Sequence, residues 1–159
     1  MTEQPTADTS DMNWVMDNLT QEKGVMHAVL LSGDGLKLAH SNTLTCYTDG
    51  CRHKSESACP QAGADRLAAK ASGINSLARV SEHEFPGAAD LKPRKVMVDL
   101  DGHTLLVFSG AARSSVVVFL EAEFTSAEVS VATSATIKVI NGLREKLSAR
   151  ERTDHPRRS

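Results

Sequence analysis

The sequence is poor in aromatic residues, in charge of one sign and in long apolar runs. Tryptophan, tyrosine and phenylalanine make up 4% of its 159 residues, too few for the stacked aromatic side chains that hold single-stranded nucleic acids. Its net charge of −2 lacks the basic excess typical of nucleic-acid-binding domains. No run approaches the roughly 18 apolar residues of a transmembrane helix. We therefore expect neither nucleic-acid binding nor a transmembrane segment.

Cysteine is also scarce, and the N-terminus carries no recognisable export signal. Three cysteines are too few for a disulfide framework. Residues 1–11 are polar and acidic and contain no apolar core of a signal peptide. We expect a cytoplasmic protein whose association with a membrane, if it occurs, is through its partners.

The length predicts one domain with polar ends. A chain of 159 residues can bury a core without disulfides or metals. Its first residues are acidic, and residues 144–159 carry six arginines and lysines against three acidic residues. We expect disordered tails at residues 1–10 and 149–159, and a folded domain at 11–148 with a cysteine-containing loop at about 45–60.

Hydrophobic periodicity predicts three helices and five strands. The helices are expected at 11–23, 61–81 and 125–149, and the strands at 25–31, 36–39, 95–100, 103–109 and 115–120. Tight turns at 32–35 and at Asp101-Gly102 join two strand pairs as hairpins. The order α-β-β-α-β-β-β-α predicts an α+β fold with helices packed on an antiparallel sheet.

The second helix carries two stripes on nearly opposite sides. One is apolar and suits packing on a sheet: Leu67, Ala71, Ile74 and Ala78. The other consists of small residues: Ala69, Gly73, Ser76 and Val80. A glycine inside a helix costs about 1 kcal/mol relative to alanine. The second stripe is either a tolerant alanine-rich surface or a face that packs against a second copy.

All three cysteines lie in the polar stretch before this helix, together with a histidine. Cys46, Cys51, His53 and Cys59 could form a Cys3His zinc site, but they lack the closely spaced pair that makes zinc motifs specific. The alternatives are a solvated loop with incidental thiols and a redox switch between two of them. We expect no other cofactor.

Several further residues have more than one interpretation. Trp14 lies opposite the apolar side of the first helix, so it is either core or an exposed anchor for a partner. His27, His40 and His103 match no ligand spacing, and we expect them on strand surfaces. There is no phosphate-binding loop and no grouping of nucleophile, base and orienting residue, so we expect no enzyme.

Two strings resemble a known family. MHAVLLSGDGLKLA (26–39) and GADRLAAKASGINSLAR (63–79), with the order of elements, are similar to the Roadblock/LC7 domain. The resemblance is narrower to small actinobacterial roadblock proteins encoded in conservons, beside a Ras-like GTPase and a histidine-kinase-like sensor. It covers about residues 11–148 and departs at 45–60, where the family's link between strand two and helix two is shorter.

The resemblance implies a Roadblock/LC7-like five-stranded antiparallel sheet, with helices one and three on one face and helix two on the other. It also implies a homodimer joined through the edge strand at 95–100 and through helix two. The expected interface residues are Ala69, Gly73, Ser76, Val80, Lys95, Val96 and Val98.

The function implied is that of a non-enzymatic regulator or scaffold of a small Ras-like GTPase; some bacterial members of the family stimulate their partner's GTP hydrolysis. We expect the GTPase to bind the exposed part of helix two, near Arg66, Lys70, Asn75 and Arg79. The histidine-kinase-like sensor is a further expected partner. The alternatives are a metal or redox sensor built on the cysteine loop, and a sensor of a small ligand.

Overall fold

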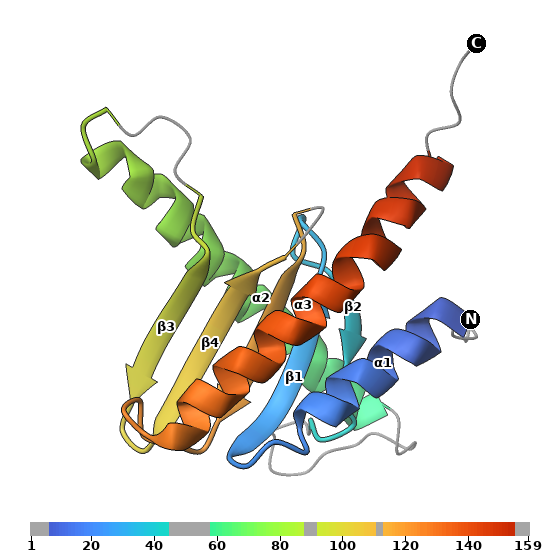
Figure 1. Cartoon of the computed structure of the whole chain (residues 1–159), viewed down its shortest axis with the longest axis horizontal. Coiled ribbons are helices and arrows are strands. Elements are labelled where there is room, and N and C mark those ends of the chain that lie inside the picture. Colours follow the sequence, from blue (N-terminus) through green and yellow to red (C-terminus); the bar gives the residue numbers. More distant parts are fainter. Residues whose placement is uncertain (1–6, 45–57, 88–91, 111–112, 155–159) are drawn as a thin grey trace.

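A five-stranded antiparallel sheet with helices on both faces forms the body of the protein (Figure 1). The computed structural model describes residues 7–44, 58–87, 92–110 and 113–154. The helices are α1 (Ala7–Leu19), α2 (Ala58–Val80), the short 3-10 helix η1 (Ser81–Glu84) and α3 (Ala127–Asp154). The strands are β1 (Val25–Leu31), β2 (Lys37–His40), β3 (Lys95–Leu100), β4 (His103–Ser109) and β5 (Ser115–Leu120). This arrangement confirms the predicted α+β class and the order of its elements.

The strands lie in the order β2-β1-β5-β4-β3, and every neighbouring pair is antiparallel. Helices α1 and α3 cover one face and α2 covers the other (Figure 1). The three central strands are apolar along their length because both of their faces are covered. The layers are those that the resemblance to Roadblock/LC7 domains implies.

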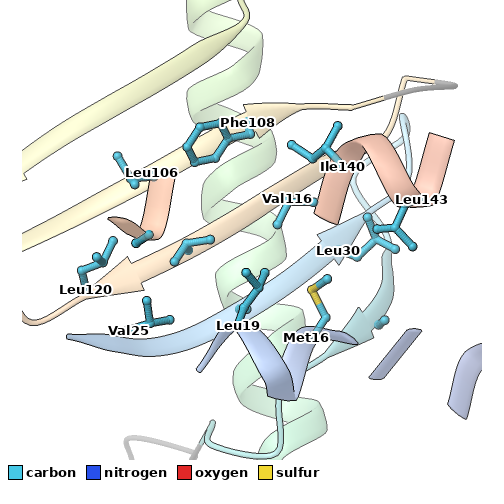
Figure 2. Close-up of a cluster of buried hydrophobic side chains, with 14 of the residues drawn as sticks. Met16, Leu19, Val25, Leu30, Leu106, Phe108, Val116, Leu120, Ile140 and Leu143 are labelled. Carbon is cyan, nitrogen blue, oxygen red and sulfur yellow. The ribbon is translucent and has the colours of Figure 1, made fainter. Parts of the chain in front are cut away.

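The core between the sheet and the α1–α3 layer is built by alternate residues of the strands (Figure 2). Leu30, Leu106 and Val118 point to this side and are fully buried. The helices contribute apolar residues at 3.6-residue spacing, including Met16 of α1 and Ile140 of α3.

The second core, under α2, differs from the prediction in its helical contribution. The residues closest to the sheet are Ala64, Ala68 and Ala71, which are almost completely buried. Ala71 belongs to the predicted apolar stripe, whereas Leu67 and Ile74 of the same stripe are only half-buried beside these alanines. Small side chains let the helix axis approach the sheet, so the larger ones flank the contact.

The ends of two helices differ from those that the sequence predicts. Helix α1 ends at Leu19 rather than at Lys23, because both the amide and the hydroxyl of Thr20 donate to the carbonyl of Asp17. It begins at Ala7, so residues 7–10 are helical where we expected a tail, as are residues 149–154 of α3. The division into one domain and two tails stays a prediction.

The two edge strands of the sheet, β2 and β3, differ in what lies beside them. At the β2 edge, α1 lies alongside the strand, and the backbone amide of His40 donates to Asn13 Oδ1 at 3.0 Å. The amide of Asn42 donates to Asp17 Oδ1 at 2.6 Å. At the other edge, β3 pairs with β4 and has no second neighbour among the described strands.

The turn between β1 and β2 is pressed against α2. Gly35 there has a φ of +83°, a left-handed conformation that favours glycine. A Cβ added at this position would lie 2.5 Å from Ser72 Oγ and 2.9 Å from Ser72 Cβ. The close approach therefore requires glycine on steric grounds as well as conformational ones.

No helix in the described part of the chain is both long and apolar enough to cross a bilayer. This agrees with the sequence, in which polar residues interrupt every apolar segment.

Candidate functional site

The side of α2 that faces away from the sheet is a continuous exposed strip of small and apolar residues. We call it the α2 outer face and define it as Ala69, Gly73, Ser76, Leu77 and Val80. Leu77 and Val80 are the largest of these, with 74% and 64% of their surface exposed. An isolated exposed apolar residue is ordinary, but neighbouring ones on one helix face are typical of an interaction surface.

Gly73 lies in the middle of this face, away from the other described parts of the protomer. A Cβ placed on it would meet nothing within 4 Å, so no neighbouring atom of the described chain requires a glycine there. In a helix interior the residue costs about 1 kcal/mol relative to alanine. Its one structural advantage is to let another molecule approach the helix backbone closely.

The free edge of the sheet lies next to this face. One flank of α2 faces β2, because Asp65 on that flank forms an ion pair with Lys37 of β2, with 3.1 Å between Lys37 Nζ and Asp65 Oδ1. At 3.6 residues per turn, Leu77 is on the other flank, which faces β3. Lys95 of β3 is exposed, and Val96 and Val98 are half-buried. The α2 outer face and the β3 edge therefore form one surface.

The sequence analysis found most of this surface but missed Leu77. The signal was available, because Leu77 is six residues from the buried Ala71 and hence on the opposite half of the helix. This large apolar side chain is left mostly exposed by the part of the protomer that the structure describes.

The four residues expected to bind a GTPase do not lie together. Lys70 and Arg79 are exposed and Arg66 is half-buried. Asn75 is 9% exposed and faces the sheet, where its Nδ2 donates to Ser115 Oγ at 2.8 Å. The expectation that Asn75 lies on the exposed surface is wrong: a polar residue on the buried stripe reaches a hydroxyl of β5.

Arg79 lies on the flank of α2 that faces the turns at the end of the sheet. Together with Arg113 and Ser32 it lines a small polar cavity of about 30 Å³, roughly the volume of one water molecule. The cavity is too small for an organic ligand, so Arg79 is better suited to contacting a partner from the surface.

The proposed zinc ligands lie mostly outside the described residues. Cys46, Cys51 and His53 are among the residues that the structure does not describe, whereas Cys59 is described and lies half-buried in the first turn of α2. Among the residues that the structure describes, no three histidine, cysteine, aspartate or glutamate side chains are placed to hold a metal. The zinc site and the redox switch stay predictions.

Trp14 is exposed. Its side chain projects from α1 away from the sheet, with 65% of its surface exposed, whereas Met12 and Met16 on the other side of the helix are buried. The interpretation of Trp14 as a core residue is wrong, and that of an exposed anchor is consistent with its position.

Of the three histidines expected on strand surfaces, His27 is buried instead. Only 8% of its surface is exposed, and its Nδ1 lies 3.0 Å from Thr43 Oγ1. Its ring also lies 6.2 Å from that of Phe119. Burial disfavours the charged imidazolium and lowers the pKa of His27 below its ordinary value. The imidazole of His27 is therefore an uncharged, buried group at the edge of the core.

This burial predicts a loss of stability in mild acid. Because the folded-state pKa of His27 is lowered, the unfolded chain binds the proton more readily, and the free energy of unfolding falls as pH drops below about 6.5. Urea denaturation at pH 7.5 and pH 5.5 measures the loss. In His27→Gln, which keeps a polar side chain but cannot titrate, the difference between the two pH values should shrink. An unchanged difference would assign it to other groups.

Comparison with known proteins gives a consistent result at the level of structure. No protein-family model matches the chain, and no curated protein matches it in sequence. A crystal structure of a Roadblock/LC7 domain from Streptomyces avermitilis is 27% identical and superposes with a TM-score of 0.63, over 86% of this chain and 97% of that one.

Two structures of MglB show the same fold at lower identity. MglB from Myxococcus xanthus is 11% identical, with a TM-score of 0.60 over 93% of this chain and 96% of that one. MglB in a tetrameric arrangement is 14% identical, with a TM-score of 0.60 over 90% and 94%. The two layers of helices, the strand order and these superpositions agree: the chain has the Roadblock/LC7 fold.

Proposed function

We propose that this protein is a homodimeric, non-enzymatic regulator or scaffold of a small Ras-like GTPase. The observation that carries the proposal is the α2 outer face beside the free β3 edge, a surface that is apolar, rigid and unpartnered in the described chain. The resemblance to Roadblock/LC7 domains supports the same conclusion, since it implies a dimer that serves small GTPases as a platform.

The dimer would join two copies through both parts of this surface. Pairing of β3 with its counterpart satisfies the backbone groups that an edge strand leaves open. Gly73 lets the two α2 helices approach, and Leu77 and Val80 supply apolar area at the contact. A twofold arrangement is the ordinary outcome for a self-complementary patch.

The GTPase would contact the dimer through the parts of α2 that remain accessible. Arg79 is the strongest candidate because it lies on the flank away from β3 and so outside the dimer contact. Lys70 and Arg66 lie seven and eleven residues before Leu77 and so share its flank, which faces β3; their part in GTPase binding stays a prediction, while Asn75 is withdrawn because it is buried. Arginine is prominent among interface residues that dominate binding energy. The histidine-kinase-like partner stays a prediction.

Charge reversal at Arg79 is expected to weaken GTPase binding at least about tenfold while leaving the dimer intact. The measurement is a titration of a Ras-like GTPase encoded next to this gene, loaded with GDP or with a GTP analogue, against wild type and Arg79→Glu. Different affinities for the two nucleotide states would show that the protein can shift the GTPase between them.

Lys138→Glu is the matched control, since Lys138 is an exposed cation of α3 on the other side of the sheet. It should bind the GTPase as wild type does. Equal affinities of wild type and Arg79→Glu would move the contact elsewhere, with the exposed Trp14 as the next candidate. Failure to bind any GTPase encoded nearby would favour a sensor built on the cysteine loop.

A further inference from the structure

A groove of about 1250 Å³ runs between α3 and the start of β3, on the face of the sheet opposite α2. At its bottom lie Phe108 of β4 and Ile140 of α3, core side chains with 3% and 8% of their surface exposed, which project into the layer between the sheet and α3 (Figure 2). Ile137, 47% exposed, forms part of the α3 wall. The groove lies on the opposite face of the sheet from the α2 outer face, and Lys95 is the residue that lines the groove and also belongs to the β3 edge.

Both walls of the groove are held in place. On the β3 side, the amide of Ser109 donates to the carbonyl of Arg94 at 3.0 Å, and the hydroxyl of Ser109 donates to the carbonyl of Pro93 at 2.6 Å. On the other side, Ile137, Asn141 and Arg144 follow one face of α3 at helical spacing. A prearranged groove binds with less loss of conformational freedom than mobile loops do.

The charge of the groove has one sign. Among the described residues, four cations line it and no acidic side chain does: Lys92, Arg94, Lys95 and Arg144. None of these four forms an ion pair within the described residues. This contrasts with the chain as a whole, whose net charge is −2. An apolar floor between cationic rims calls for an occupant that is apolar along one side and anionic at its margins.

We propose that this groove binds an acidic amphipathic segment of a partner protein. From Ile137 to Arg144 the α3 wall rises about 10 Å, which corresponds to about two turns of a bound helix. Apolar side chains of the segment would cover Ile137, and its carboxylates would meet the cations at the rims. A concave site suits a polypeptide better than a lipid bilayer, which presents a broad flat surface.

The probe for this proposal is a labelled helical peptide about four turns long, with leucine along one face and glutamate beside it. Fluorescence anisotropy should show saturable binding that weakens with added salt. Addition of the peptide should change the NMR signals of Phe108 and Ile140, which would place the bound peptide in the groove. A peptide with every glutamate replaced by glutamine should bind at least about tenfold more weakly.

The decisive variant is Arg94→Glu/Arg144→Glu, which reverses one cation on each rim. It should weaken peptide binding at least about tenfold. Lys70→Glu/Lys138→Glu makes the same change in net charge outside the groove and should leave the affinity within about twofold. Circular dichroism checks that both variants fold, and neither the peptide binding nor these controls require a GTPase.

Three outcomes would overturn the proposal. The first is no saturable binding of the glutamate peptide. The second is an equal loss in the two double variants, which would mean general attraction to a positive surface. The third is binding to phosphatidylserine vesicles without binding to the peptide, lost in Arg94→Glu/Arg144→Glu, which would assign the groove to membranes.

Discussion

Replacing Leu77 with glutamate should convert a dimer of twice the 17.1 kDa chain mass into monomers. Leu77 is 74% exposed in the protomer, so the substitution leaves the fold undisturbed. In the dimer each new carboxylate would lie near its symmetry mate in a contact from which water is excluded. Like charges brought together in this way cost several kcal/mol, so we expect dimer affinity to fall at least about a hundredfold. Gly73→Glu should act in the same way.

Size-exclusion chromatography with light scattering measures this change. Val131→Glu is the matched control, because Val131 is an apolar residue of α3 with 51% of its surface exposed on the other side of the sheet. It should remain a dimer. A wild-type protein that is monomeric at all accessible concentrations would contradict the proposed interface outright.

Gly35→Ala should lower the free energy of unfolding by about 2 to 4 kcal/mol. Part of the loss is conformational, since a left-handed backbone costs a non-glycine residue about 1 to 2 kcal/mol. The rest is steric, because the new methyl group would come within 2.9 Å of Ser72 Cβ and nearer still to its hydroxyl. Relieving this contact requires the turn or α2 to move, and overpacking typically costs about 1 to 3 kcal/mol.

Gly102→Ala separates the two contributions. Gly102 has a similar φ of +70°, but a Cβ there would meet nothing within 4 Å. Urea denaturation should therefore give Gly102→Ala the conformational loss alone, and Gly35→Ala a clearly larger one. Adding Ser72→Ala to Gly35→Ala should restore part of the difference. Equal losses for the two glycine variants would show that the turn does not press on α2.

The strands were predictable because their signals are local. The turn at Asp101-Gly102 fixes the β3–β4 hairpin, and unbroken apolar runs such as that of β5 mark strands covered on both faces. Helix ends were less predictable. The end of α1 depends on the hydroxyl of Thr20, which donates to a carbonyl one turn earlier, so the helix ends at Leu19 rather than at Lys23, the end that the sequence predicts.

The candidate site was only partly predictable, since exposure depends on contacts distant in sequence. Spacing alone placed Gly73 and Val80 on a second face of α2. Spacing could not predict the burial of Asn75, whose side-chain amide donates a hydrogen bond to the hydroxyl of Ser115 in β5. The basic groove could not be predicted from the sequence for the same reason. Arg94 and Arg144 are fifty residues apart, and they line one groove only because α3 packs on the sheet.

The unequal edges of the sheet limit how many copies can join. At β2, the amide of His40 is already bonded to Asn13 and α1 lies alongside, so that strand cannot template another. At β3, no other described strand pairs with the outer side. A second copy that adds there brings its own blocked β2 edge to the far end of the joined sheet. In the proposed dimer, growth by strand addition would therefore stop at two copies, without the endless filaments that an open strand at each end would permit.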